Sequence, residues 1–433
     1  MTVLHPVFGT PVPDEWEVST VDDIKSPEKS SCVAGPFGSN ISSKFFVADG
    51  VPVIRGSNLT DDLTQFVGEH FVFVSTDQAQ SYVAQHVVAG DLVFTCWGTI
   101  GQVGLIPRDG PYSAYIISNK QLKLRPDPLV ADSAFLFHYF ASPKMVEYIR
   151  NRAIGSAVPG INLGILKGLP VVLPPLAIQR KIVAVLSTYE DLIENNNRRI
   201  KVLEEIAQRI YREWFVDFRY PGHEDVPMVD SELGPIPQGW EVAPLASLAS
   251  VVMGQSPPSS AYNMDRGGLP FHQGVGSYGL HFPVHTVYST VGNRFAEDGD
   301  VLVSVRAPVG RINVADRKMI LGRGLAGVRA NVAPSTFVLE ALQYFFREED
   351  VLGNGAIFKS VTRRDVEGLP LVWPGTSLAT EFSHHVAPMR NALKLFTTEV
   401  TNLRMTRDLL LMRLISGEID ITDLDIAMPE VAA

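Results

Sequence analysis

Few residues in this chain have the type and spacing of a catalytic centre. The neighbouring histidines His384 and His385 point to different faces of a helix and make a poor metal site. Cys32 and Cys96 show no CxxC spacing, so neither a disulfide framework nor a cysteine metal site is expected. Neither Pro-Pro pair has the preceding Asp or Asn and the following aromatic residue with which an amino-methyltransferase holds an exocyclic amine.

Enzyme motifs of other kinds are also missing from the sequence. It contains no GxxxxGK[ST] phosphate loop, no GxSxG and no HExxH. The glycine-rich stretch 155–168 does not stand in the strand–turn–helix context of a dinucleotide site. We therefore predict a non-catalytic chain with no metal or cofactor of its own.

The composition is that of a folded protein, with 45% hydrophobic residues. The net charge of −10 argues against a sequence-blind nucleic-acid binder, which usually carries a basic excess. The first residues lack the basic start and apolar core of a signal peptide, and no apolar run approaches the length of a membrane span. With two cysteines in all, a reducing cytoplasm and no membrane association are expected.

An internal repeat dominates the organisation of the chain. Trp16-Glu17-Val18 returns as Trp240-Glu241-Val242, Gly90-Asp91 returns as Gly299-Asp300, and Gly168-Leu169-Pro170 returns as Gly368-Leu369-Pro370. A repeat of about two hundred residues predicts two similar halves related by an approximate two-fold axis.

The pattern predicts an α+β fold, with two similar strand-rich domains related by pseudo-two-fold symmetry and separated by an antiparallel coiled coil of two long helices. Shorter helices are expected over 132–152 and 334–349, near the end of each domain. The expected divisions are a first domain at 1–173, a first long helix at 174–216, a linker at 217–230, a second domain at 231–373, a second long helix at 374–417 and a tail at 418–433, disordered from 428.

Each long helix carries residues spaced alternately by three and four, which is typical of a coiled-coil seam. In the first helix these are Leu186, Tyr189, Ile193, Asn196, Ile200, Leu203, Ala207, Ile210 and Trp214. In the second they are Val386, Met389, Leu393, Phe396, Val400, Leu403, Arg407, Leu410 and Leu414. Antiparallel pairing would place 200 opposite 400 and bring the polar members Asn196 and Arg407 near each other. The alternative is that each helix lies on its own domain.

Several short motifs together resemble one family, the specificity subunits of type I restriction–modification systems, in the family's order along the whole chain. They are 35–40 (GPFGSN), 53–58 (VIRGSN), 98–102 (GTIGQ), 158–162 (VPGIN), 173–179 (LPPLAIQ), 210–218 (IYREWFVDF), 305–310 (VRAPVG), 322–326 (GRGLA) and 414–419 (LISGEI). The second repeat departs from the pattern at 375–378, which puts helix docking there in doubt.

The resemblance implies two target-recognition domains, each of which reads one half of a bipartite site in double-stranded DNA. It implies that the helices act as a spacer and as the docking surface for two methylation subunits. Those subunits would bring S-adenosylmethionine, and restriction subunits would bring the motor and nuclease with ATP and Mg. The seam would hold the domains about 42 Å apart at roughly 1.5 Å per residue, or about 12 base pairs.

Base reading requires side chains that reach base edges from exposed loops. Trp97 and Gln102 occupy the positions that Arg306 and Arg311 take in the second repeat. The arginines suit guanine and the glutamine suits adenine, whereas Trp97 would contact a sugar or a thymine methyl, or be buried. Further candidates for DNA contacts are Lys44, Arg55, Lys120, Lys123 and Ser156 in the first domain, and Arg323, Lys359, Arg363 and Arg364 in the second.

Three other functions stay open at this point. The chain could be the recognition subunit of a related bipartite-site system whose partner is a fused nuclease–methylase. It could be a stand-alone methyltransferase or nuclease, against which the missing cofactor motifs argue. It could also be a coiled-coil scaffold with no role on DNA, as the acidic balance allows.

Overall fold

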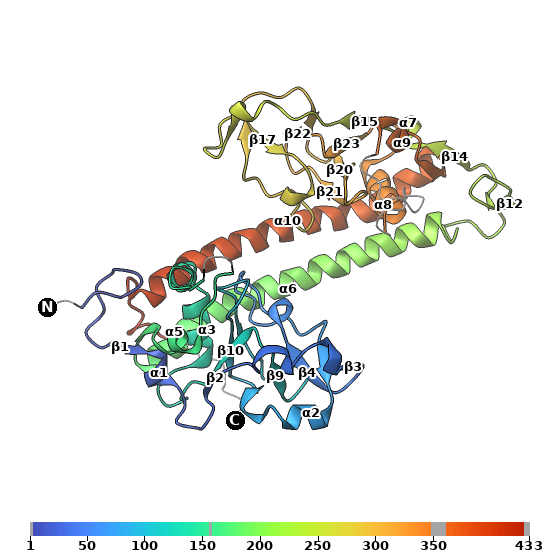
Figure 1. The fold of residues 1–433 in the computed structure, drawn as a ribbon. Coiled ribbons are helices and arrows are strands. Elements are labelled where there is room, and N and C mark those ends of the chain that lie inside the picture. The colour runs from blue at the N-terminus through green and yellow to red at the C-terminus, as the bar shows by residue number, and fades with distance from the viewer. Residues whose placement is uncertain (1–2, 156–157, 348–360, 428–433) are drawn as a thin grey trace. The chain divides into compact units, whose positions relative to one another are not determined.

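The computed structural model describes residues 3–155, 158–347 and 361–427 (Figure 1). Ser156, Lys359 and the tail from 428 therefore lie outside the described residues, as do the last positions of the helix expected at 334–349. The chain forms two compact units, unit 1 with Met1–Leu192 and Asn402–Ala433, and unit 2 with Ile193–Thr401. Each unit contains the domain of one repeat and part of both long helices.

The domain in unit 1 is built on two main sheets in its described part. One is antiparallel with the order β2-β10-β7-β8, and the other has the order β3-β5-β4-β9-β6, in which β4 and β9 run parallel. The strands are β1 Glu17–Thr20, β2 Cys32–Ala34, β3 Phe46–Val47, β4 Val51–Ile54, β5 Val72–Val74, β6 His86–Val87, β7 Leu92–Thr95, β8 Val103–Leu105, β9 Tyr115–Ile117, β10 Gln121–Leu124 and β11 Pro170–Leu173.

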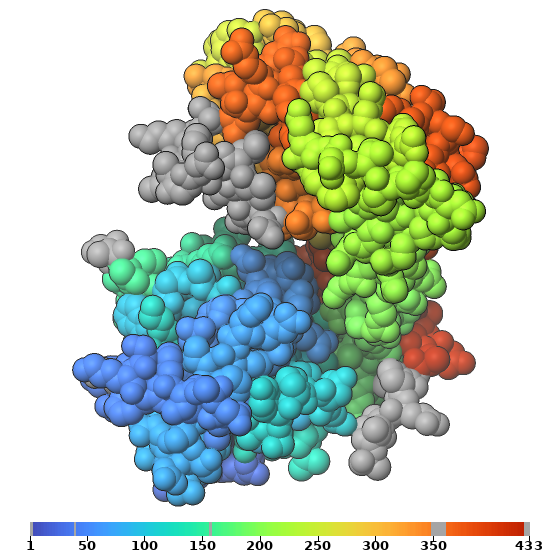
Figure 2. All heavy atoms as spheres, turned by 90° about the vertical axis from the view of Figure 1, so that its right-hand side faces the viewer, coloured from blue at the N-terminus to red at the C-terminus, as the bar shows by residue number. Residues whose placement is uncertain are grey.

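The domain in unit 2 repeats this topology strand for strand. Its sheets have the orders β15-β23-β20-β21 and β16-β18-β17-β22-β19, with β17 and β22 parallel. The strands are β14 Glu241–Pro244, β15 Ala249–Met253, β16 Tyr262–Asn263, β17 Leu269–His272, β18 Tyr288–Ser289, β19 Phe295–Ala296, β20 Val301–Ser304, β21 Ile312–Val314, β22 Met319–Leu321, β23 Leu325–Ala330 and β24 Pro370–Trp373. The linker before it, with β12 Met228–Val229 and β13 Ile236–Pro237, lies on the surface in yellow-green in Figure 2.

The repeated sequence triplets form matching strand pairs. Strand β1 pairs antiparallel with β11, and β14 pairs antiparallel with β24. The register joins Val18 to Val172 in the first repeat and Val242 to Val372 in the second. The triplets at the start and at the end of each repeat therefore lie next to each other in space, where they close the domain.

Short helices cover the sheets and shape the loops. The helix expected over 132–152 is divided into α3 and α4 at Pro143, because proline cannot continue the backbone hydrogen bonds of the preceding turn. The α-helices are α1 Val21–Ile24, α2 Thr76–Gln80, α3 Ser133–Ala141, α4 Pro143–Arg150, α5 Leu163–Lys167, α6 Leu176–Phe215, α7 Leu245–Leu248, α8 Ser335–Phe345, α9 Arg363–Glu367 and α10 Thr376–Ile415. The 3-10 turns are η1 Gly38–Asn40, η2 Ser43–Phe45, η3 Gly56–Asn58, η4 Val83–Gln85, η5 Ser259–Ala261 and η6 Val275–Ser277.

The long helices α6 and α10 pack antiparallel within unit 2. The guanidinium of Arg199 lies 5.5 Å from the ring centre of Phe396. Further along α6, the ring of Tyr211 lies 6.0 Å from that of Phe382. Residues later in α6 therefore contact residues earlier in α10, as expected for an antiparallel pair.

The same direction holds within unit 1. Ile182 and Leu186 of α6 share a core with Leu411 and Leu414 of α10. Next to Ile182 on α6, the Lys181 ammonium donates to the carbonyl of Thr422, beyond the end of α10, at 2.7 Å. The antiparallel helix pair that the sequence predicts is thus present in each unit.

Every expected seam position is at least half-buried. The fully buried positions are Leu186, Ile193, Asn196, Ile200, Ala207, Val386, Leu393, Val400, Arg407 and Leu414. The half-buried positions are Tyr189, Leu203, Ile210, Trp214, Met389, Phe396, Leu403 and Leu410. The helices also contribute to the domain cores, since Ile178 joins the core of unit 1 and Phe382 that of unit 2. In the part of the chain that the structure describes, no helix is long and apolar enough to cross a membrane.

Candidate functional site

Three loops of the first domain line a common hollow. Because β4 and β9 run parallel, the turns that follow them leave the same edge of the sheet, and the loop after β7 joins them. The hollow has a volume of about 530 Å³. Its lining residues are Ile41, Phe46, Arg55, Gly56, Ser57, Thr95, Trp97, Gly98, Thr99, Ser118, Asn119, Lys120 and Gln121.

This hollow brings together three of the residues singled out in the sequence. Arg55 is half-buried, and its Nε is buried without a hydrogen-bond partner. Lys120 is exposed. Trp97 is 41% exposed, and its ring lies against the backbone of Gly160, where an added Cβ would approach to 2.4 Å. The alternative of a buried Trp97 is therefore wrong, and the hollow combines two cations with an accessible aromatic edge.

Gln102 holds this loop together, which corrects its expected role as a base reader. Its amide Nε2 donates to the carbonyl of Leu59 at 3.0 Å. Its Oε1 accepts hydrogen bonds from the hydroxyls of Thr95 and Thr99. An adenine would have to displace these bonds, so Gln102 positions the loop and Trp97 presents its side chain.

Lys123 is also corrected, because it is buried at 2% exposure. Its ammonium donates to the carbonyls of Ala84 and His86, at 2.8 and 2.9 Å. Burial lowers the pKa of this amine, which reflects the cost of holding a charge there. Lys123 ties η4 and β6 to the sheet and does not reach a phosphate. Lys44, by contrast, is exposed on η2, outside the residues that line the hollow.

The second domain presents equivalent loops with different side chains. After β20, the loop carries Arg306 and Arg311, and after β22 the turn carries Arg323, all of them exposed. Ser304 holds the first loop, since its hydroxyl donates to the carbonyl of Pro308 at 2.6 Å and accepts from the amide of Arg311 at 2.8 Å. In the second domain the loop is therefore held by Ser304, the last residue of β20. In the first domain the equivalent loop is held by Gln102, which directly precedes β8.

The remaining arginines of the second domain lie on α9. Arg363 and Arg364 are both exposed. Arg363 forms an ion pair with Glu367 one turn away, at 2.7 Å. Arg363 could leave Glu367 and bind a phosphate at little cost in stability, because an exposed i,i+4 ion pair contributes only about 0.3–0.5 kcal/mol.

Both domains share an ion pair that the sequence analysis missed. Asp91 accepts two bonds from Arg125, at 2.7 and 2.8 Å, and Asp300 accepts two from Arg329, at 3.0 and 2.7 Å. The repeated Gly-Asp dipeptides pointed to the two aspartates. They did not point to the arginines, because Arg125 lies 34 residues after Asp91 whereas Arg329 lies 29 residues after Asp300.

The turns after β4 and β17 are held by different chemistry. In η3, the amide of Asn58 donates to the carbonyls of Val67 and Glu69, at 3.1 and 2.9 Å. In η6, the equivalent third residue is Ser277, whose hydroxyl lies 2.7 Å from Nδ1 of His272. No sequence motif marks His272, although its partners Ser277 and His285 lie only five and thirteen residues away.

Neither a metal site nor a reactive thiol is found among the described residues. Among them, no three His, Cys, Asp or Glu residues are grouped so as to hold a metal ion. Burial raises the pKa of both Cys32 and Cys96 to about 11, so these thiols stay protonated and unreactive at neutral pH. A duplicated frame with exposed cationic loops suits a protein that recognises a nucleic acid.

Comparison with known proteins specifies this class further. Residues 13–205 match the family model of the type I restriction modification DNA specificity domain. The MjaX and MjaIX type I restriction enzyme specificity subunits of Methanocaldococcus jannaschii are 28% and 22% identical, over 94% and 95% of both chains. The type I restriction-modification system S subunit from M. genitalium has a similar fold, with a TM-score of 0.57 at 15% identity over 92% of this chain and 96% of that one.

Along almost its whole length the chain is therefore similar to type I restriction–modification specificity subunits, and residues 13–205 match the DNA specificity domain of that family. It is accordingly a non-catalytic component that confers DNA specificity. The readings as a stand-alone enzyme or as a scaffold without a role on DNA are not favoured.

Proposed function

We propose that each domain reads one half of a bipartite site in double-stranded DNA. The observation that carries this proposal is the duplicated frame, which presents equivalent loops with different side chains. Arg55, Trp97 and Lys120 face one half-site, and Arg306, Arg311 and Arg323 face the other. Guanidinium groups suit guanine edges, and ammonium groups suit phosphates. Arg363 and Arg364 add phosphate contacts, and Lys44 adds one in the first domain.

The test is selection of bound DNA from a random duplex library, with the full chain and its methylation subunits at a stated salt concentration. The wild type should select a bipartite motif. Arg306→Ala should reduce the preference at one or two bases of one half-site by about tenfold, since a bidentate contact contributes about 1–3 kcal/mol. Trp97→Ala should affect only the other half-site. Equal effects of either variant on both halves would contradict the proposal.

The same selection tests the long helices as a spacer. Seven residues added to both α6 and α10 would lengthen the pair by about 10 Å at roughly 1.5 Å per residue. The preferred spacer should then grow by about three base pairs, while both half-sites stay the same. An unchanged spacer would show that something other than helix length sets the distance between half-sites.

The long helices also offer two exposed apolar surfaces for partners, one in each unit. In unit 2, Val202 and Ile206 of α6 are 47% and 40% exposed and lie one turn apart. In unit 1, Met405 and Leu409 of α10 are 60% and 67% exposed with the same spacing. Isolated apolar pairs on a helix suit a partner helix. Two methylation subunits would dock there with S-adenosylmethionine, and restriction subunits would add ATP- and Mg-dependent cleavage in the cytoplasm.

Native mass spectrometry of the assembled complex tests this docking. Val202→Lys with Ile206→Lys should remove one methylation subunit, and Met405→Lys with Leu409→Lys should remove the other. The exposed polar residue Gln208 of α6 provides a control, since Gln208→Lys should leave both subunits bound. Loss of both subunits from either double variant would argue against two separate docking surfaces.

A further inference from the structure

The loop that follows β2 carries the most exposed large hydrophobic side chain among the described residues. This side chain is Phe37, which is 91% exposed. A single exposed apolar residue needs no explanation by itself, because much of any protein surface is apolar. What singles out Phe37 is its place, since its loop is bonded to residues that line the hollow of the first domain.

The backbone of this loop is held on both sides of Phe37. The amide of Gly35 donates to the carbonyl of Gln121 at 2.9 Å. Beyond Phe37, the carbonyl of Gly38 accepts from the side-chain amide of Asn119 at 2.9 Å. Gln121 and Asn119 both line the hollow. A fixed loop therefore presents an exposed phenyl ring at the edge of the hollow, so little backbone entropy is lost when a ligand contacts the ring.

The free surface of the ring distinguishes Phe37 from the other aromatic residue at this edge. Trp97 is 41% exposed, because its ring lies against the backbone of Gly160. Phe37 has more than twice this exposed fraction, which leaves both faces of its ring open. A side chain that enters between two base pairs must be free on both faces, and phenylalanine is one of the residues that proteins insert in this way.

Cationic side chains of the first domain suit the approach of DNA to this loop. Lys120 is exposed and directly follows Asn119, which holds the loop. Lys44 is exposed on η2, in the same stretch of chain between β2 and β3. Ammonium groups bind phosphates and fix the position of a duplex without reading its bases. They would bring a duplex against the edge at which Phe37 stands.

The second domain has no such side chain at the equivalent position. Gly254 follows β15 as Gly35 follows β2, and a Cβ added to either glycine would collide with a backbone carbonyl oxygen. Two residues after Gly254 stands Ser256, which is half-buried. Its hydroxyl donates to the side chain of Gln273 at 2.7 Å and accepts from the amide of Arg323 at 3.2 Å. The serine is therefore used within the fold.

We propose that Phe37 enters the first half-site between two base pairs and unstacks them, so that the first domain selects its half-site partly by how easily the DNA deforms. The steps TA and CA/TG unstack most readily, so the first half-site should contain one of them at the point of insertion. The second half-site is read without such a wedge. This inference rests on the proposed division of one domain per half-site.

Permanganate footprinting of the complete complex tests the insertion, because permanganate oxidises thymines that have lost their stacking. Both TA and CA/TG steps contain a thymine. The duplex is the one that wild type selects from the random library. In its first half-site, wild type should expose a thymine that Phe37→Ala does not. Phe37→Leu should keep this thymine reactive, since leucine also acts as a wedge. Thymines that the methylation subunits expose react with both proteins and are subtracted.

Affinity and base preference provide a second readout. Phe37→Ala should weaken binding of the selected duplex by about tenfold, as expected for the loss of one aromatic contact with a base, and should relax the preference at the inserted step alone. Leu129→Ala is the matched control. Leu129 is 85% exposed and follows the other end of β10 from the hollow, so this variant should change neither readout. Hydrogen exchange should show that both variants keep the wild-type fold.

The outcomes separate this inference from the proposed function. A wild-type motif that is not bipartite would contradict the proposed function itself. A bipartite motif whose thymines react equally with wild type and Phe37→Ala would overturn the inference alone. Loss of a methylation subunit from Phe37→Ala, measured by native mass spectrometry, would also overturn it, because Phe37 would then be a contact between proteins.

Discussion

The two recognition domains differ where they face a ligand and agree where they hold their own shape. Both have the same order of strands, and both buttress it with a buried aspartate and an arginine. At the exposed edge, the position of Trp97 in the first domain is occupied by Arg306 in the second, and the position of Asn119 is occupied by Arg323. The frame is therefore separable from the reading side chains, so one fold can serve two different targets.

The residues that hold the two reading loops also differ between the domains. Gln102 holds the loop of Trp97 by its side-chain amide, whereas the Ser304 hydroxyl holds that of Arg306. Each loop is thus held by residues of its own repeat. A change in one reader and in its support leaves the other domain untouched, which permits independent change of the two half-sites.

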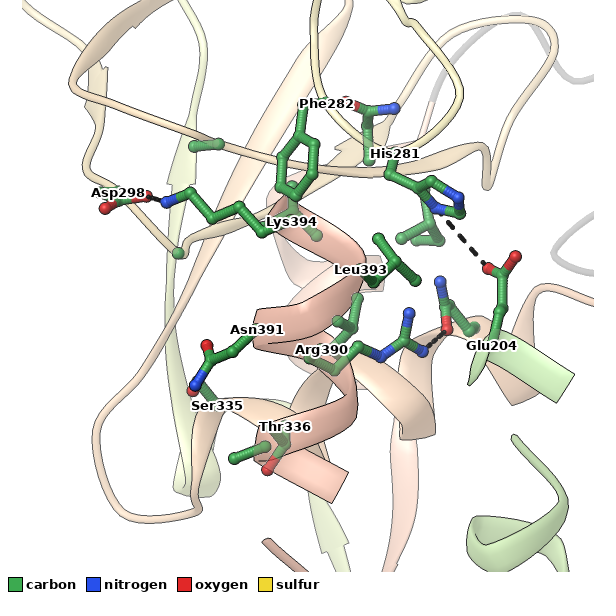
Figure 3. Close-up of a pocket in the computed structure, with 18 of the residues that line it drawn as sticks. Glu204, His281, Phe282, Asp298, Ser335, Thr336, Arg390, Asn391, Leu393 and Lys394 are labelled. Atoms are coloured by element: carbon green, nitrogen blue, oxygen red, sulfur yellow. Dashed lines mark hydrogen bonds and ion pairs between the residues drawn. The ribbon is translucent and has the colours of Figure 1, made fainter. Parts of the chain in front are cut away.

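The domains also attach to the long helices through different residues at equivalent helix positions. In unit 1, the carboxylate Glu190 of α6 lies 3.8 Å from His138 of α3. In unit 2, the equivalent position of α10 is Arg390, which forms an ion pair with Glu340 of α8. Figure 3 shows Arg390 on α10, together with Lys394, which binds Asp298 at 2.8 Å. The attachment in unit 2 is strongly ionic, and that in unit 1 is not.

The largest expected effect tests the shared frame. Asp91→Ala and Asp300→Ala each remove a buried carboxylate that also accepts a backbone amide, from Val88 and Glu297 respectively. Each should destabilise its domain by about 2–4 kcal/mol, less than a fully buried pair because the arginines are partly exposed. Hydrogen exchange by mass spectrometry should show faster exchange in β7 and β10 for the first variant, and in β20 and β23 for the second.

The control for this pair is Asp49→Ala, an exposed aspartate in the first domain. It should leave exchange in both sheets unchanged. If Asp91→Ala loosened the sheets of both domains equally, the two frames would not be independent, and the comparison between them would fail.

A smaller effect is expected where the first domain meets α6. The buried amide of Gln179 donates to the carbonyls of Pro174 and Val130, at 2.9 and 3.2 Å, and accepts from the amide of Asp132 at 2.8 Å. Gln179→Ala should cost about 2–3 kcal/mol by leaving these groups without partners. Hydrogen exchange should rise at the start of α3, whereas Gln208→Ala on the exposed face of α6 should have no effect. An unchanged α3 would mean that apolar packing alone fixes this junction.

The second domain docks without a glutamine, which explains one doubt raised by the sequence. The position equivalent to Gln179 is Ala379, which is fully buried. Phe382, one turn further on, packs edge-on against Phe215 with ring centres 5.0 Å apart. The departure at 375–378 therefore changes the chemistry of the junction and does not abolish it.

The repeat and the heptad spacing predicted the fold well, because both are local patterns. The matching triplets revealed the repeat, and α6 and α10 begin and end within two residues of the expected bounds. The site was harder to predict. Lys123 and Gln102 have the side chains of DNA readers, but both are used within the fold, and only tertiary contacts reveal this. The expected contact between Asn196 and Arg407 stays a prediction.

The smallest expected effect concerns pH and the neutral attachment of unit 1. Burial raises the pKa of Glu190 to about 7, although Arg407 and Gln65 oppose the shift. Burial lowers the pKa of His138 to about 3, so this imidazole is neutral and offers no ion pair. The folded state therefore favours protonated Glu190. That contribution is complete below pH 4.5 and is lost as the pH rises through about 7.

Glu190→Gln removes this penalty and should stabilise unit 1 at pH 8 by about 1–2 kcal/mol, with little change at pH 5. Glu340→Gln in unit 2 should instead destabilise at pH 8, because it breaks the ion pair with Arg390, and should do so less at pH 5, because burial raises the pKa of Glu340. Thermal unfolding of the full chain at both pH values, with hydrogen exchange to assign each unit, measures the difference. If Glu190→Gln destabilised unit 1 at pH 8, Glu190 would be ionised and paired, and the two attachments would be alike.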